Sequence, residues 1–128
     1  MIVVVGAHSR KVGKTSIGCS ILRAVPEARW TAVKISARRT GPDGGYQAIQ
    51  ETAASPRNDT GRFLLAGAAE AWRLRARDEE MPLAAEAVRA WARQGRNLLV
   101  ESNRIVEFVE PDLYAFALDF GVEDFKES

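Results

Sequence analysis

The sequence predicts an α/β fold in one domain, built on a mostly parallel sheet of about five strands. Short apolar runs such as residues 2–5 alternate along the chain with segments of helical periodicity such as residues 82–94. Strands that alternate with helices favour a parallel sheet with right-handed crossovers. The length of 128 residues suits a single domain (1–128) with a real hydrophobic core, and 46% hydrophobic with 27% charged residues is typical of globular proteins.

Five segments have the composition of strands, and predicted helices lie between them. The expected strands are residues 2–5, 31–35, 70–75, 97–101 and 113–118. The expected helices are residues 15–25, 60–66 and 82–94, with a turn or two of helix at 104–109. Asn58 or Asp59 is a candidate cap for the second helix, and Pro82 and Gly95 mark the start and the end of the third.

The first strand leads through a loop into Gly13-Lys14-Thr15 at the start of a helix. A strand, a loop and a helix N-terminus in this order form a phosphate-binding cradle, because backbone N–H groups converge there and the helix dipole favours negative charge. Lys14 would add a positive charge against the β- and γ-phosphates, and the Thr15 hydroxyl would be a ligand for Mg²⁺. The residues predicted to bind the phosphates are Ser9, Arg10, Lys11, Val12, Gly13, Lys14, Thr15 and Ser16. This arrangement predicts a P-loop NTPase-like three-layer fold.

The phosphate loop departs from the usual pattern at one position. The pattern G-x-x-x-x-G-K-[ST] places a glycine where this chain has His8, and Gly6 lies two positions earlier as a partial substitute for the missing backbone freedom. The alternative interpretation is an ordinary turn followed by a helix cap. The position directly after an N-terminal apolar strand favours phosphate binding.

Two charged residues end predicted strands at the same edge of the sheet. Glu101 follows Leu98-Leu99-Val100, and Lys34 lies at the end of the second strand. Ligands bind at the carboxyl ends of strands in open α/β sheets. Because an unpaired buried carboxylate is costly in free energy, the position of Glu101 predicts that it binds Mg²⁺. The alternatives are an exposed strand end or a pair with an arginine. Lys34 is predicted to reach the same pocket edge.

Residues 36–57 are rich in glycine and proline and fit no compact element, so we predict a long flexible loop. Because this segment leaves the carboxyl end of the second strand, it is either a lid over the phosphate site or an ordinary solvated loop. Residues 121–128 are predicted to be a loose tail.

The motif order resembles the MobB family, the P-loop proteins of molybdopterin-guanine dinucleotide biosynthesis. The likeness spans about residues 2–101, and most of its weight rests on residues 59–68, Asp-Thr-x-Arg followed by Ala-Gly-Ala. It implies that Lys14 and Thr15 bind nucleotide phosphate and Mg²⁺, that Glu101 belongs to the magnesium shell, and that Asp59 and Arg62 border the site. It further implies GTP as ligand, weak GTP hydrolysis, a tendency to form homodimers, and a nucleotidyltransferase-type protein partner.

Three features differ from that family. Ser36-Ala37-Arg38-Arg39 replaces the histidines that follow the second-strand lysine, and Ser102 replaces the glycine after the strand-end acid. The chain also ends sooner after its fifth strand than is usual in the family. In view of these differences, the nucleotide site is better supported by the sequence than the molybdenum-cofactor role is.

The predicted reaction is slow phosphoryl transfer, with Lys14 and Glu101 as the catalytic residues and Arg38, Arg39 or Arg62 as candidates to reach the transferring group. The chain has no Asn-Lys-x-Asp guanine-reading motif, so GTP and ATP both remain open. Two rival functions also remain open. One is an ATP-dependent small-molecule kinase or ligase of the dethiobiotin synthetase-like type, with an acceptor pocket built from residues 36–57 and 102–103. The other is a degenerate P-loop domain that serves as an interaction module.

Charge and composition argue against other classes of function. A formal net charge of +1 predicts no nonspecific binding to nucleic acid or to an acidic membrane surface. One cysteine rules out an internal disulfide and suits a reducing cytoplasm, where we expect the protein to be located. No apolar stretch approaches the roughly 20 residues that span a bilayer.

Overall fold

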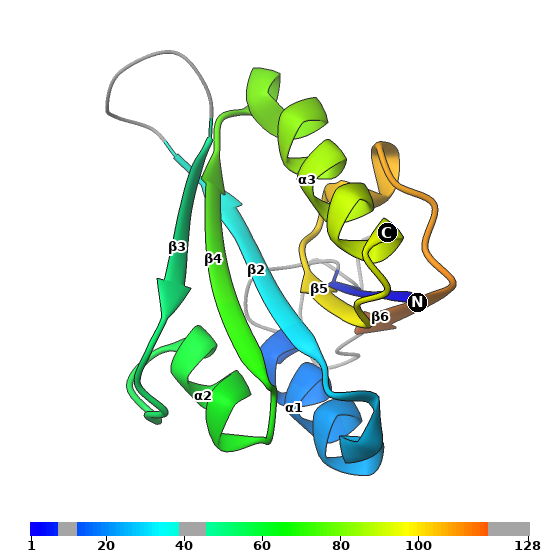
Figure 1. Ribbon diagram of the computed structural model, residues 1–128. Coiled ribbons are helices and arrows are strands. Elements are labelled where there is room, and N and C mark those ends of the chain that lie inside the picture. Colours follow the sequence, from blue (N-terminus) through cyan, green and yellow to red (C-terminus); the bar gives the residue numbers. More distant parts are fainter. Residues whose placement is uncertain (8–12, 39–45, 118–128) are drawn as a thin grey trace, which may run out of the picture.

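The structure, a computed structural model, describes residues 1–7, 13–38 and 46–117 (Figure 1). Its strands are β1 (Ile2–Ala7), β2 (Thr31–Ala37), β3 (Gln47–Glu51), β4 (Glu70–Ala76), β5 (Leu98–Glu101) and β6 (Leu113–Ala117). Its helices are α1 (Lys14–Ala24), α2 (Asp59–Leu65) and α3 (Met81–Arg93), with the 3₁₀ turns η1 (Pro26–Ala28), η2 (Asp78–Glu80) and η3 (Ile105–Glu107). The chain is therefore α/β, as the sequence predicts.

The described strands form one sheet in the order β3-β4-β2-β5-β1-β6. All neighbouring pairs are parallel except β3 and β4, which run antiparallel. The mostly parallel sheet is confirmed, and each predicted strand lies within two residues of an observed one. Its central strands are buried on both faces, which explains their nearly continuous apolar sequences.

The prediction of about five strands and of a loop over residues 36–57 needs correction, because Gln47–Glu51 forms the sixth strand. This strand lies at the edge of the sheet, and its residues are exposed or half-buried. An exposed edge strand needs no alternation of apolar and polar residues, so the usual sequence signal of a strand is missing here. The first part of the predicted loop, residues 39–45, and the predicted tail, residues 121–128, lie outside the described residues.

Helices cover both faces of the sheet and bury two separate apolar clusters. Alternate residues of β1 point to opposite faces, so Val3 and Val5 pack with Leu22 of α1 and Phe63 of α2. Ile2 and Val4 belong to the other cluster, which includes residues 84, 85 and 88 of α3. Helix α3 thus packs on one face of the sheet, and α1 and α2 pack on the other.

Helix α1 packs very closely against its neighbours at Gly18. A Cβ atom at this position would lie 3.0 Å from a Leu99 methyl group and 3.1 Å from the Phe63 ring. Glycine thus lets α1 approach both β5 and α2, which brings the first turn of α1 next to the residues that end β5.

Within the described ranges, none of the helices has both the length and the apolar character needed to cross a bilayer.

Candidate functional site

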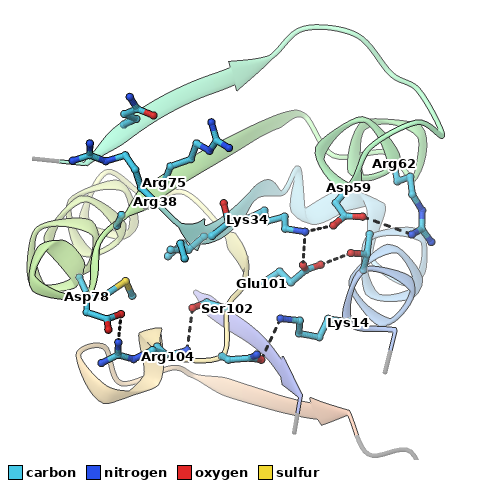
Figure 2. Close-up of a pocket in the computed structure, with 18 of the residues that line it drawn as sticks. Lys14, Lys34, Arg38, Asp59, Arg62, Arg75, Asp78, Glu101, Ser102 and Arg104 are labelled. Atoms are coloured by element: carbon cyan, nitrogen blue, oxygen red, sulfur yellow. Dashed lines mark hydrogen bonds and ion pairs between the residues drawn. The ribbon is translucent and has the colours of Figure 1, made fainter. Parts of the chain in front are cut away.

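A pocket of about 1160 Å³ opens at the carboxyl ends of β2, β4 and β5, beside the N-terminus of α1 (Figure 2). Parallel strands gather their ends at one edge, which is where ligands bind in open α/β sheets. Six cationic and three anionic side chains line the pocket, so its charge favours an anionic ligand. Figure 2 shows two ends, one around Lys14, Asp59 and Arg62 and another around Arg38 and Arg75. We call them the phosphate end, after the ligand that the sequence predicts there, and the distal end.

The first turn of α1 faces the phosphate end. Gly13 precedes the helix with φ 76° and ψ 35°, a left-handed conformation that glycine adopts without strain. Among the described residues, no side chain caps this helix N-terminus, and the first turn of the helix contains no acidic residue. The first backbone N–H groups of a helix need acceptors from outside the helix, so this turn is suited to an anionic ligand.

Thr15 and Glu101 meet at the centre of the phosphate end. The Thr15 hydroxyl donates a hydrogen bond of 2.6 Å to Oε1 of Glu101, and the Glu101 residue is only 2% exposed. Its other oxygen, Oε2, lies 3.5 Å from Nζ of Lys34. The register explains this contact, because Lys34 and Glu101 are partners across β2 and β5 and therefore share a face. Glu101 thus pairs with a lysine rather than with an arginine.

Asp59, the first residue of α2, completes the ionic network. Its carboxylate accepts a hydrogen bond from Lys34 and lies 3.9 Å from Nη1 of Arg62. Burial alone would raise the pKa of Asp59, but the hydrogen bond and charge of Lys34, aided by Arg62, lower the pKa below its ordinary value. Arg62 also donates a hydrogen bond of 3.1 Å to the Ser16 hydroxyl, which joins α2 to the first turn of α1.

Lys14 lines the pocket, and its amine lies 3.2 Å from Oδ1 of Asn103 as donor to that oxygen. The same oxygen accepts the backbone N–H of Ala7 at 3.0 Å. Asn103 therefore joins the end of β1 to the side chain that the sequence assigns to phosphate. Sequence reasoning did not give Asn103 this role, because its only signal is a position two residues after the strand-end acid.

The donor set of the phosphate end fits Mg²⁺ better than a metal that requires nitrogen or sulfur ligands. It offers the Thr15 hydroxyl and the carboxylates of Glu101 and Asp59, and hard oxygen donors suit this ion. No group of three or more His, Cys, Asp or Glu side chains within the described residues could hold a metal. A magnesium ion here would need further oxygens from phosphate or water, as is usual at nucleotide sites.

Most of the predicted site residues converge. Gly13, Lys14, Thr15, Lys34, Asp59, Arg62 and Glu101 line one end of the pocket, and Ser16 contacts it through Arg62. The predicted residues Ser9, Arg10, Lys11 and Val12 lie outside the described residues, as does Arg39.

The distal end contains a buried ion pair that the sequence does not reveal. Nη2 of Arg38 donates a 2.7 Å hydrogen bond to Oε2 of Glu80, and the two residues are 7% and 5% exposed. Glu80 also accepts the backbone N–H of Arg77 at 2.8 Å through its other oxygen. Arg38, a candidate to reach a transferring phosphoryl group, is thus engaged with Glu80.

We found no match for this chain among protein-family models, curated proteins or solved structures.

Proposed function

We propose that this chain is a P-loop nucleotide-binding protein with a P-loop NTPase-like fold, which binds a nucleoside triphosphate together with Mg²⁺ and hydrolyses it slowly. The observation that carries the proposal is the buried hydrogen bond between Thr15 and Glu101 at the carboxyl edge of the sheet. A magnesium–phosphate site requires oxygen ligands close together, and here the hydroxyl at the start of α1 contacts the carboxylate at the end of β5. The mostly parallel sheet with helices on both faces is consistent with this fold.

The residues of the phosphate end have separate tasks in this proposal. Lys14 and the first amides of α1 neutralise charge on the phosphates, since positioning and electrostatic stabilisation dominate phosphoryl transfer. Thr15 and Glu101 would hold Mg²⁺, which would supply additional positive charge next to the phosphate oxygens. Lys34, whose amine lies 3.5 Å from Oε2 of Glu101, offsets the negative charge of this carboxylate. Slow turnover is expected, because Arg62 is already held by Ser16 and Asp59.

The resemblance to MobB extends the proposal to GTP as the nucleotide, a homodimer, a nucleotidyltransferase-type partner and a role in molybdenum cofactor biosynthesis. These four points rest on the resemblance alone. The second candidate is an ATP-dependent kinase or ligase for a small molecule, and the extension of the pocket to the distal end favours it.

Binding of labelled GTP and ATP, with and without Mg²⁺, tests the proposal on the intact chain. Lys14→Ala should lower the affinity at least about tenfold, because hydrogen bonds to charged groups contribute about 1.5–3 kcal/mol. Arg23→Ala, at the far end of the same helix, is the control and should bind like the wild type. Equal nucleotide affinity of Lys14→Ala and the wild type, or no binding by the wild type, would contradict the proposal.

Glu101→Gln tests the magnesium part separately. The amide keeps the shape of the side chain and can still accept the Thr15 hydrogen bond, but it removes the negative charge. We expect nucleotide binding without Mg²⁺ to persist and its enhancement by Mg²⁺ to disappear. An unchanged magnesium titration would give Glu101 a purely structural role.

A further inference from the structure

Three polar side chains form a row across three neighbouring strands at the distal end of the pocket. Arg75 of β4 is the register partner of Ser36 on β2 and of Gln47 on β3. All three residues line the pocket. Register partners point to the same face of a sheet, and neighbouring strands are only about 4.8 Å apart, so these side chains project side by side.

This row lies on the same face of the sheet as the phosphate end. Ser36 follows Lys34 by two residues on β2, and side chains two residues apart share a face. Two residues along a strand amount to about 6.6 Å, which places the row next to the Lys34–Glu101 contact and one step closer to the carboxyl edge. A molecule held by the row would thus share the pocket with a nucleotide held at the other end.

Arg75 differs from the other arginines that line the pocket. Arg38 is paired with Glu80, Arg62 with Asp59, and Arg104 with Asp78 and Glu107. Arg75 is exposed, and it forms no ion pair or side-chain hydrogen bond within the described parts of the chain. Within the described residues, therefore, no carboxylate pairs with its charge, and a guanidinium group offers five N–H donors to a ligand.

We propose that the row of Gln47, Arg75 and Ser36 binds the oxyanion group, a carboxylate or a phosphate, of a second small molecule that occupies the pocket together with the nucleotide. A guanidinium group binds either oxyanion through two parallel hydrogen bonds. The Gln47 amide and the Ser36 hydroxyl add donors on both sides of Arg75. The proposal deepens the proposed function, since it names the class of a second ligand of the same pocket.

The neighbouring charges favour a ligand with one oxyanion group at this position. Arg38 and Glu80, which are buried at the same end of the pocket, carry opposite charges and form an ion pair, whereas Arg75 has no ion-pair partner among the described residues. Because Arg75 is exposed to water, we expect weak binding of an isolated oxyanion and stronger binding of a molecule that also fills the pocket.

Titrations of ¹⁵N-labelled protein with succinate and with inorganic phosphate test the proposal. The readout is the chemical shift of the arginine Nε–H groups, with the Arg75 signal assigned from its loss in Arg75→Gln. Both titrations are performed with a non-hydrolysable GTP analogue and Mg²⁺ present, and again on Lys14→Ala, in which the phosphate end is disabled. Comparing the two anions distinguishes a carboxylate-bearing from a phosphate-bearing ligand.

The expected result is a saturable shift of the Arg75 signal with at least one anion, and an affinity about tenfold lower in Arg75→Gln when followed on neighbouring backbone amides. Arg93→Gln, on the exposed face of α3, is the matched control and should bind like the wild type. No shift at Arg75 with either anion, or equal affinity in Arg75→Gln, would overturn the proposal. Arg75-dependent binding by a wild-type chain that fails to bind nucleotide would support this subsite and contradict the proposed function instead.

Discussion

The two ends of the pocket use charge in different ways. At the phosphate end, Lys34 contacts both Asp59 and Glu101, and Arg62 joins this network to helix α1. At the distal end, Arg38 and Glu80 form a buried ion pair, while Arg75 is exposed and has no polar partner among the described residues. At the phosphate end, the same charged residues stabilise the fold and form the candidate site. At the distal end, Arg38 and Glu80 stabilise the fold, and Arg75 is the residue that we propose binds the ligand.

This difference is useful because it can be measured. A side chain that supports the fold changes the free energy of unfolding when it is replaced, whereas a side chain kept only for a ligand does not. Substitutions at the two ends should therefore separate into those that destabilise the protein and those that leave its stability unchanged.

The largest effect is expected for Glu80→Ala. Removing this carboxylate breaks the buried ion pair with Arg38, and breaking a buried ion pair typically costs about 3–5 kcal/mol. Urea unfolding should show a loss of this size in the free energy of unfolding. Glu79→Ala, an exposed neighbour, is the control and should change stability by about 0.5 kcal/mol or less. Similar losses of unfolding free energy in both variants would show that the Arg38–Glu80 ion pair stabilises the fold no more than an exposed carboxylate does.

The next effect is expected for Gly13→Ala at the phosphate end. A Cβ atom would have no neighbour within 4 Å among the described residues, whereas the φ angle of 76° is one that residues with a side chain rarely adopt. The left-handed conformation costs about 1–2 kcal/mol for most residues, and we expect a loss of that size in urea unfolding. Gly13→Asn should lose less, because asparagine tolerates this conformation. Equal losses in the two variants would show that backbone strain is not the cause.

A smaller effect concerns the acid stability contributed by Asp59. Its pKa in the folded protein lies below its ordinary value of 3.8, so the unfolded chain binds more protons in the range between the two values. The contribution is therefore fully present above pH 3.8 and is lost as the pH falls through the folded-state pKa. Asp59→Asn should flatten the dependence of the unfolding free energy on pH below about 4. If the unfolding free energy of the variant depended on pH below about 4 in the same way as that of the wild type, Lys34 would not lower the pKa of Asp59.

Three residues at the phosphate end could be placed there from the sequence because they follow local rules. Lys14 and Thr15 stand directly after an apolar strand and a loop, and Glu101 ends an apolar run, so each is visible within a few residues of sequence. Asp59 and Arg62 needed the resemblance to a known family, since nothing in their local pattern places them beside Lys34. Their contacts with Lys34 and Ser16 come from the packing of α2 beside α1 and β2.

The distal end was not predictable for a different reason. Gln47 belongs to an exposed edge strand without apolar alternation, and Arg75 looks like an ordinary arginine on a strand. Their relation to Ser36 depends on the register of β2, β3 and β4, which joins residues far apart in the sequence. The pairing of Arg38 with Glu80 is likewise a contact between residues 42 positions apart.

The smallest effect on stability is expected for Arg75→Ala, and it is the sharpest test of the contrast between the two ends. Arg75 is exposed and makes no polar contact within the described residues, so its removal should change the free energy of unfolding by about 0.5 kcal/mol or less. Urea unfolding of the variant and the wild type measures this difference. A loss comparable to that of Glu80→Ala would show that Arg75 supports the fold, and its place in the pocket would then need no ligand to explain it.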